Sequence, residues 1–209
     1  MADQTGRRRL MPSLALALLL CAPVAAHAAE KGPSLDQILE EVGIEPVSPP
    51  RKAPAFALST LDGEATSLED FKGRMVLLHF WATWAPPASY EMADLGKLQR
   101  ALDVKDFAVL AVATDVRGKP AVEKFVREYA PTVLVLLDPE GETLLDYDII
   151  VVPTSILIDG KGRVIGRAVG ARSWDSKSVI NALKKLVKAP ARYGIIASGP
   201  ASPSSERSR

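Results

Sequence analysis

Three short apolar runs stand out against the more polar remainder of the chain. They cover residues 75–81, 107–114 and 132–137, and each is short enough to be a strand buried on both faces. Apolar residues recur every three to four positions after the first run, after the second run and near the end of the chain, which predicts three amphipathic helices. These helices are expected to begin near Pro86–Pro87, near Pro120 and at Trp174. Such alternation predicts an α/β fold with parallel strands and right-handed crossovers.

The segments around these runs carry turn and cap signals. Ser34 and Gln37 match a capping box and Gly43 a helix stop, so a short amphipathic helix is predicted over residues 34–43. This helix can dock on the domain or recruit a partner. Asp62–Gly63 predicts the turn of a hairpin within residues 54–63, and a second hairpin is predicted from residues 156–159 and 164–170.

Composition divides the chain into four parts. With 209 residues, 47% of them hydrophobic, it can bury one sizeable core, which we place in residues 54–188. Residues 29–53 are predicted to be the short helix followed by a stiff linker, because prolines stand at positions 46, 49 and 50. Residues 189–209 are rich in Pro, Ser, Gly and Arg and are predicted to be a disordered tail.

The first 28 residues have the pattern of a secretory signal peptide. Three arginines at 7–9 precede an apolar stretch over residues 10–24, and Ala26-His27-Ala28 resembles a cleavage site. The protein is therefore predicted to be periplasmic or secreted, by the general or the twin-arginine route, with no membrane span after cleavage. The alternative is an uncleaved anchor, although Pro12 and Pro23 shorten the apolar run. Cleavage would remove Cys21, the only cysteine.

Residues 80–92 read Phe-Trp-Ala-Thr-Trp-Ala-Pro-Pro-Ala-Ser-Tyr-Glu-Met. This stretch resembles the active-site loop and helix of the thioredoxin superfamily, and in particular of the TlpA/ResA-type thiol–disulfide oxidoreductases. The run 151–159 resembles the second hallmark of that family, in which a cis-proline, here Pro153, lies beside the active-site loop. The resemblance implies a thioredoxin-like α/β fold with a central mixed β-sheet flanked by helices. Alanine stands at both family cysteine positions, Ala85 and Ala88.

The family's chemistry depends on a cysteine thiolate at a helix N-terminus. Ala85 and Ala88 have no ionisable or nucleophilic atom, and the hydroxyls of Thr83 and Ser89 have no base nearby in the sequence to activate them. His79 lies within an apolar run and is predicted to be packed and hydrogen-bonded. After the predicted cleavage His79 is the only histidine, and one histidine without thiols makes no metal site, so we expect neither metal nor cofactor. Glu91 is interpreted as an exposed or cap-stabilising acid in the first turn of its helix.

What the resemblance leaves at the site is a groove for a protein or an extended peptide. Its predicted residues are Trp81, Trp84, Pro87, Val152, Pro153 and Thr154. The chain is thus predicted to be an exported, redox-inactive TlpA-like protein that binds a partner there. One alternative is a thiol–disulfide oxidoreductase whose cysteines were replaced to inactivate it. Another is a structural subunit whose groove is filled by its own N-terminal helix. Because 26 basic residues balance 25 acidic ones, no nucleic-acid partner is expected.

Overall fold

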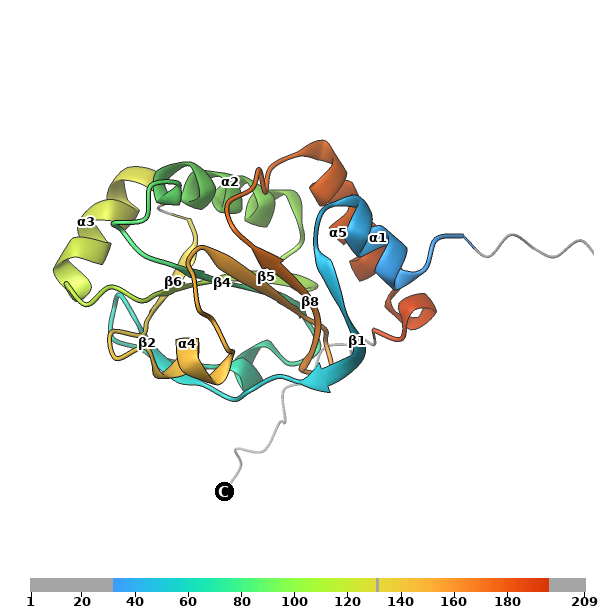
Figure 1. Cartoon of the computed structure of the whole chain (residues 1–209), viewed down its shortest axis with the longest axis horizontal. Coiled ribbons are helices and arrows are strands. Elements are labelled where there is room, and N and C mark those ends of the chain that lie inside the picture. The colour runs from blue at the N-terminus through green and yellow to red at the C-terminus, as the bar shows by residue number, and fades with distance from the viewer. Residues whose placement is uncertain (1–31, 131, 196–209) are drawn as a thin grey trace, which may run out of the picture. The chain divides into compact units, whose positions relative to one another are not determined.

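The computed structural model describes residues 32–130 and 132–195. Eight strands form one mixed sheet in the order β1-β8-β7-β4-β5-β6-β2-β3. Figure 1 shows this sheet with the helices around it. The strands are β1 (Glu45–Lys52), β2 (Ala57–Thr60), β3 (Ala65–Ser67), β4 (Met75–Trp81), β5 (Phe107–Ala113), β6 (Leu134–Leu137), β7 (Thr154–Ile158) and β8 (Arg163–Val169). The helices are α1 (Leu35–Glu41), α2 (Ala88–Ala101), α3 (Lys119–Tyr129), α4 (Glu142–Asp146) and α5 (Lys177–Lys188), with 3₁₀ turns η1 (Leu68–Phe71) and η2 (Pro190–Tyr193).

The centre of the sheet confirms the predicted parallel core. β4 pairs in parallel with β5, and β5 with β6, whereas β7 runs antiparallel to β4 and forms a hairpin with β8. The first predicted hairpin is also present, as β2 and β3 joined through the turn at Asp62–Gly63. The predicted thioredoxin-like mixed sheet with flanking helices is therefore confirmed.

The two faces of the sheet carry separate hydrophobic clusters, because successive side chains of a strand point to opposite sides. From β4, Met75, Leu77 and Trp81 join the cluster that includes apolar residues of α1, α2, α3 and α5. Val76, Leu78 and Phe80 join the other cluster, which includes Phe71 of η1 and Tyr147, just after α4. The fully buried β4 strand is thus covered on both sides, as its continuous apolar run predicts.

Residues 45–52, predicted to be a linker, instead form the edge strand β1. Glu45 and Pro46 pair with β8, as do Arg51 and Lys52, but the register shifts between Pro46 and Arg51. Proline lacks the N–H that a regular ladder needs and is tolerated at edges and bulges. Pro49 and Pro50 fall within the irregular segment, which is why a proline-rich sequence can still extend the sheet.

The N-terminal helix α1 docks on the domain. Its predicted capping box is present, with the Ser34 hydroxyl accepting from the Gln37 N–H at 3.2 Å. Leu39 and Ile44 are buried against β8, where Gly166 leaves room for them: a Cβ built on Gly166 would lie 2.6 Å from Ile44 Cγ2. Of the two alternatives for this helix, docking is the one observed.

The C-terminal boundary also differs from the prediction. α5 begins at Lys177, capped by Ser176, and Trp174 lies in the preceding loop, completely buried. After α5, η2 and the buried Ile195 continue the ordered structure, so the predicted disordered tail cannot begin at residue 189. Residues 196–209 and the predicted signal peptide lie outside the described residues. No helix in the described part of the chain is both long and apolar enough to span a membrane.

Candidate functional site

The loop between β4 and α2 is held in place by one buried acid. Asp115, just after β5, accepts hydrogen bonds from the Thr83 N–H at 2.7 Å and from the Thr83 hydroxyl at 2.5 Å. The expectation that Thr83 has no base beside it is therefore wrong. Because the tertiary fold brings the end of β5 next to the end of β4, no local pattern reveals this pair. The carboxylate uses both of its oxygens to hold the loop.

The two alanines lie where the loop turns into α2. The Ala88 N–H donates to the Ala85 carbonyl at 3.0 Å, and the side chains of both residues are buried. Pro87 is the residue that caps the helix, and its side chain makes no capping hydrogen bond. The helix N-terminus, which would favour an anion such as a thiolate, is thus faced by methyl groups with no ionisable atom.

Beside this loop lies a hollow of about 380 Å³, which we call the Trp84 groove. Of the six predicted groove residues, Trp84 and Val152 line it. Pro87 is half-buried and does not contribute to the lining. The remaining lining comes from the end of β5 and from the segment that contains α4: Thr114, Val116, Pro139, Glu140, Gly141, Leu144, Ile150 and Val151.

Three predicted groove residues are instead buried. Trp81 is 1% exposed and its ring packs against Phe125, with centroids 5.1 Å apart. The physical reason is its position on β4. Trp81 points to the same face of the sheet as Met75 and Leu77, because alternate side chains of a strand share a face, and the helices cover that face. Pro153 and Thr154 are buried too, and the Thr154 hydroxyl donates to the Val151 carbonyl at 2.7 Å. The Val152–Pro153 peptide bond is cis.

Three residues of the apolar rim of the Trp84 groove, Val116, Ile150 and Val151, are not among the predicted groove residues. Ile150 is 96% exposed and Val116 84%, and Trp84 and Val151 are also more than half exposed. Four apolar residues in a row, 149–152, precede Pro153 in the sequence, but this run suggests a strand as readily as a surface. Only the turn that buries Ile149 and directs Ile150 outward distinguishes the two cases.

Glu91 is buried, contrary to the prediction of an exposed or capping acid. It is 2% exposed, and its Oε1 accepts from the Arg172 N–H at 3.0 Å. Burial raises the pKa of Glu91 to about 7. The backbone N–H and the positive charge of Arg172 oppose this shift, and so does the Trp174 indole. The indole N–H is close to Glu91 but forms no hydrogen bond to it. The helical spacing contained the signal, because Glu91 lies three residues after Ala88 and four before Leu95, both buried.

His79 is packed and hydrogen-bonded, as predicted. Its Nδ1 lies 2.8 Å from the Ser155 hydroxyl on the neighbouring strand, and the side chain is buried. Burial lowers the pKa of His79 to about 3, so the ring is neutral at ordinary pH. Within residues 32–130 and 132–195, no three His, Cys, Asp or Glu side chains come close enough together to hold a metal ion.

The N-terminal helix does not fill the Trp84 groove. Instead, α1 packs next to α5, where Ile38 and Val42 lie beside Asn181 and Ala182, and the Arg172 guanidinium donates to the Gly43 carbonyl at 2.6 Å. None of the residues that line the groove belongs to α1. The alternative of a groove filled by its own N-terminal helix is therefore wrong.

Comparison with known proteins agrees with this architecture. The thiol–disulfide oxidoreductase ResA of Bacillus thuringiensis subsp. konkukian is 32% identical over 167 residues, which cover 80% of this chain and 91% of ResA. The thioredoxin-like protein YneN of Bacillus subtilis is 39% identical over 133 residues, 63% of this chain and 75% of YneN.

A solved structure of a putative thiol:disulfide interchange protein DsbE from Chlorobium tepidum superimposes with a TM-score of 0.61 at 32% identity. The superposition covers 66% of this chain and 96% of that structure. The model of the family described as Redoxin matches residues 50–184, which include the β4–α2 loop and Pro153. The chain therefore belongs to the Redoxin family, as a ResA-like thioredoxin-fold protein in which Ala85 and Ala88 occupy the two cysteine positions.

Proposed function

We propose that this protein is exported, does no thiol–disulfide chemistry, and binds an extended segment of a partner protein in the Trp84 groove. The observation that carries the proposal is the exposed apolar rim formed by Trp84, Val116, Ile150 and Val151 around a hollow beside the two alanines. Large apolar side chains clustered at the surface are typical of interaction sites, and tryptophan is among the residues that contribute most to binding.

The backbone beside the groove supports an extended occupant. Among the described residues, neither the N–H nor the carbonyl of Val152 takes part in a hydrogen bond, and β7 begins only at Thr154. An extended peptide can therefore pair with Val152 while its alternate side chains enter the hollow. The binding energy would come from apolar contact with Trp84 and from these main-chain hydrogen bonds.

The absence of thiol chemistry is supported by the residues at the helix N-terminus. The attacking group of a thioredoxin-type site must be a thiolate, and the methyl groups of Ala85 and Ala88 cannot ionise. Thr83 is no substitute, because its hydroxyl donates a hydrogen bond to Asp115 in the contact that holds the loop. Export is supported by the signal-like pattern of residues 1–28.

Binding is tested with isotopically labelled protein titrated with a panel of cysteine-free peptides that carry apolar residues at alternate positions. We expect the amide resonances of residues 84, 116 and 150–152 to shift. Trp84→Ala should weaken binding about tenfold or more, since central aromatic residues often contribute 2 kcal/mol or more. Tyr90→Ala is the matched control, because Tyr90 is an exposed aromatic residue that does not line the groove. Equal affinities for the two variants would contradict the proposal.

A further inference from the structure

A second hollow lies at the opposite end of β4 from the Trp84 groove. Its volume is about 470 Å³, and it lies beside η1 where β7 ends at Ile158, so we call it the η1 cavity. Its floor is apolar: Phe56, Phe71, Val76 and Ile158 line it and belong to the cluster on that face of the sheet. A cavity of this volume is within the range of small-molecule sites, about 300–1,000 Å³.

Four basic residues and two acidic ones line the η1 cavity. The basic residues are Lys52, Lys72, Arg74 and Lys161, and the acidic ones are Glu69 and Asp159. One pair cancels locally, because Lys72 Nζ lies 3.4 Å from a carboxylate oxygen of Glu69. The electrostatic character of the cavity therefore depends on Asp159 and on the three remaining basic residues.

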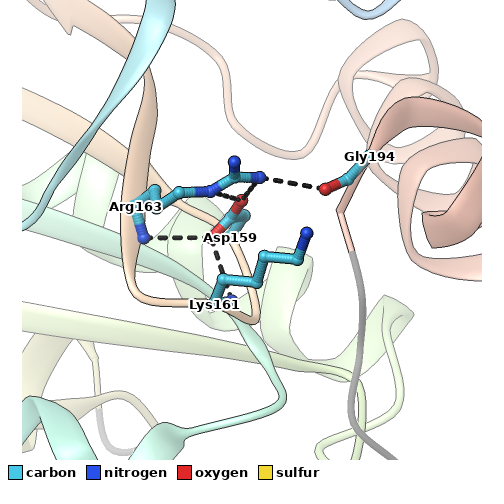
Figure 2. A network of polar contacts seen from close by, with 4 residues as sticks. All are labelled: Asp159, Lys161, Arg163 and Gly194. Carbon is cyan, nitrogen blue, oxygen red and sulfur yellow. Dashed lines mark hydrogen bonds and ion pairs between the residues drawn. The ribbon is translucent and has the colours of Figure 1, made fainter.

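Asp159 is fully engaged by the turn between β7 and β8 (Figure 2). One carboxylate oxygen accepts from the backbone N–H groups of Lys161 and Arg163, each at 2.9 Å. The other accepts from Arg163 Nε at 2.9 Å and from its terminal nitrogen at 2.6 Å, and that nitrogen also donates to the Gly194 carbonyl. The charge of Asp159 is thus neutralised by Arg163, which leaves the Lys161 ammonium uncompensated.

Among the described residues, Lys52 has no acidic partner either, whereas the guanidinium of Arg74 interacts electrostatically with the nearby Asp70 carboxylate. The Arg74 guanidinium donates to the carbonyls of Asp70 and Val104 and lies 4.5 Å from the ring centroid of Phe71. Carbonyl oxygens and an aromatic ring orient a guanidinium but do not cancel its charge. In the described part of the chain, neither Lys52 nor Lys161 forms an ion pair. The η1 cavity therefore combines an apolar floor with the uncompensated positive charges of Lys52 and Lys161.

We propose that the η1 cavity binds a small organic anion, a single compact anionic group joined to an apolar body. The apolar body would lie on the floor formed by Phe56, Phe71 and Ile158, and the anionic group would face Lys52 and Lys161. A cation would be repelled by the same lysines, and a purely polar anion would leave the apolar floor in contact with water. This inference is independent of the function proposed for the Trp84 groove.

The test uses 8-anilinonaphthalene-1-sulfonate, an apolar anion whose fluorescence rises on binding, with hexanoate as competitor. Hexanoate should displace the dye, whereas hexanamide, which lacks the charge, and acetate, which lacks the apolar body, should not. Amide resonances of Phe71, Lys161 and Gly162 should shift on addition of hexanoate, and those of Trp84 and Val152 should not.

Two variants locate the site. Lys52→Gln/Lys161→Gln should weaken dye binding about three- to tenfold, the effect of losing two partly exposed charge contacts. Lys124→Gln/Lys188→Gln removes the same charge from exposed positions on α3 and α5 and should change nothing. Ala55→Trp, at an exposed position that lines the cavity, should abolish binding without disturbing the core. The proposal is overturned if both double variants bind alike, or if Trp84→Ala removes binding and Ala55→Trp does not.

Discussion

At the scale of single residues, Ala85 and Ala88 decide what the loop before α2 can do. Their backbones are joined by the hydrogen bond from the Ala88 N–H to the Ala85 carbonyl at 3.0 Å. The end Cα atoms of such a four-residue turn lie within about 7 Å of each other. A disulfide spans about 4.4–6.8 Å between Cα atoms, so the turn has the dimensions of a disulfide loop although it holds no sulfur.

We therefore expect Ala85→Cys/Ala88→Cys, made in a Cys21→Ser background, to form an intramolecular disulfide. The oxidised variant should lose its reactivity toward a thiol-labelling reagent and regain it after reduction, and the reduced variant should reduce insulin disulfides. The Cys21→Ser protein alone should do neither. Two free thiols that resist oxidation in the double variant would show that the loop has departed from the family geometry, and insulin reduction by the cysteine-free protein would contradict the redox-inactive function.

Glu91 makes stability depend on pH. Its pKa is about 7 in the folded protein, against 4.5 for an unperturbed carboxyl, so the folded state binds a proton more tightly than the unfolded chain. The contribution of Glu91 to the free energy of unfolding should consequently fall as pH rises from 4.5 to 7 and then level off. Glu91→Gln removes this pH-dependent contribution. The free energy of unfolding of the variant, relative to that of wild type, should therefore rise by on the order of 2–3 kcal/mol between pH 4.5 and pH 7.

Urea unfolding at pH 4.5 and pH 8 measures this difference. Burial of His79 acts in the opposite sense between pH 3 and 6.5, since its pKa is lowered to about 3, but both proteins retain His79 and the contribution cancels. Glu40→Gln is the matched control, because Glu40 is exposed on α1. If the difference in unfolding free energy between Glu91→Gln and wild type does not change with pH, Glu91 is ionised in the folded protein over the same pH range as in the unfolded chain.

At the scale of elements, the attachment of α1 and β1 depends on a close approach over β8. Pro46 pairs with Gly166, and Ile44 lies directly above that glycine. A methyl group at Gly166 would overlap Ile44 Cγ2 at 2.6 Å and approach the Glu45 carbonyl at 3.5 Å. The N-terminal helix and strand can be held this closely only because position 166 has no side chain.

Gly166→Ala should therefore destabilise the protein by about 1–3 kcal/mol, the usual cost of overpacking. In an Ile44→Ala background the overlapping atom is absent, so the additional cost of Gly166→Ala should shrink. A double-mutant cycle from urea unfolding measures this coupling. Equal costs in the two backgrounds would mean that the penalty arises in the β8 backbone and not in the contact with Ile44.

At the scale of the whole molecule, the predicted signal peptide lies outside the described fold. The first described element, α1, begins at Leu35, and its cap is Ser34. Cleavage after Ala28 would therefore fall before the first described helix.

Fused to a reporter that functions only in the periplasm, residues 1–28 should direct export. Mass spectrometry of the purified protein should then find an N-terminus at Ala29. Replacement of Arg7, Arg8 and Arg9 by glutamine should reduce export, because the positive n-region orients a signal peptide. An intact Met1 on a membrane-bound product would instead favour the uncleaved anchor.

The sequence by itself determined the central strands β4, β5 and β6, their alternation with α2 and α3, and the absence of thiols from the loop before α2. These features follow from local or repeated patterns. The apolar run of β4 is short and is followed by a helical pattern, which favours a strand covered on both faces, and alanine at positions 85 and 88 is read directly. The resemblance to thioredoxin-like proteins rested on the same residues, and the family match confirmed it.

Tertiary structure alone decided which side chains reach the surface and which acids are buried. Trp81 and Trp84 are three residues apart, yet one packs on Phe125 in the core and the other is 56% exposed. Glu91 is buried because α2 turns it toward Arg172, and prolines form an edge strand because β8 accepts the irregular register. Each outcome depends on a neighbour distant in the chain. Helical spacing can place Glu91 on the buried face of α2, but no local pattern identifies Arg172, Phe125 or β8 as the neighbour.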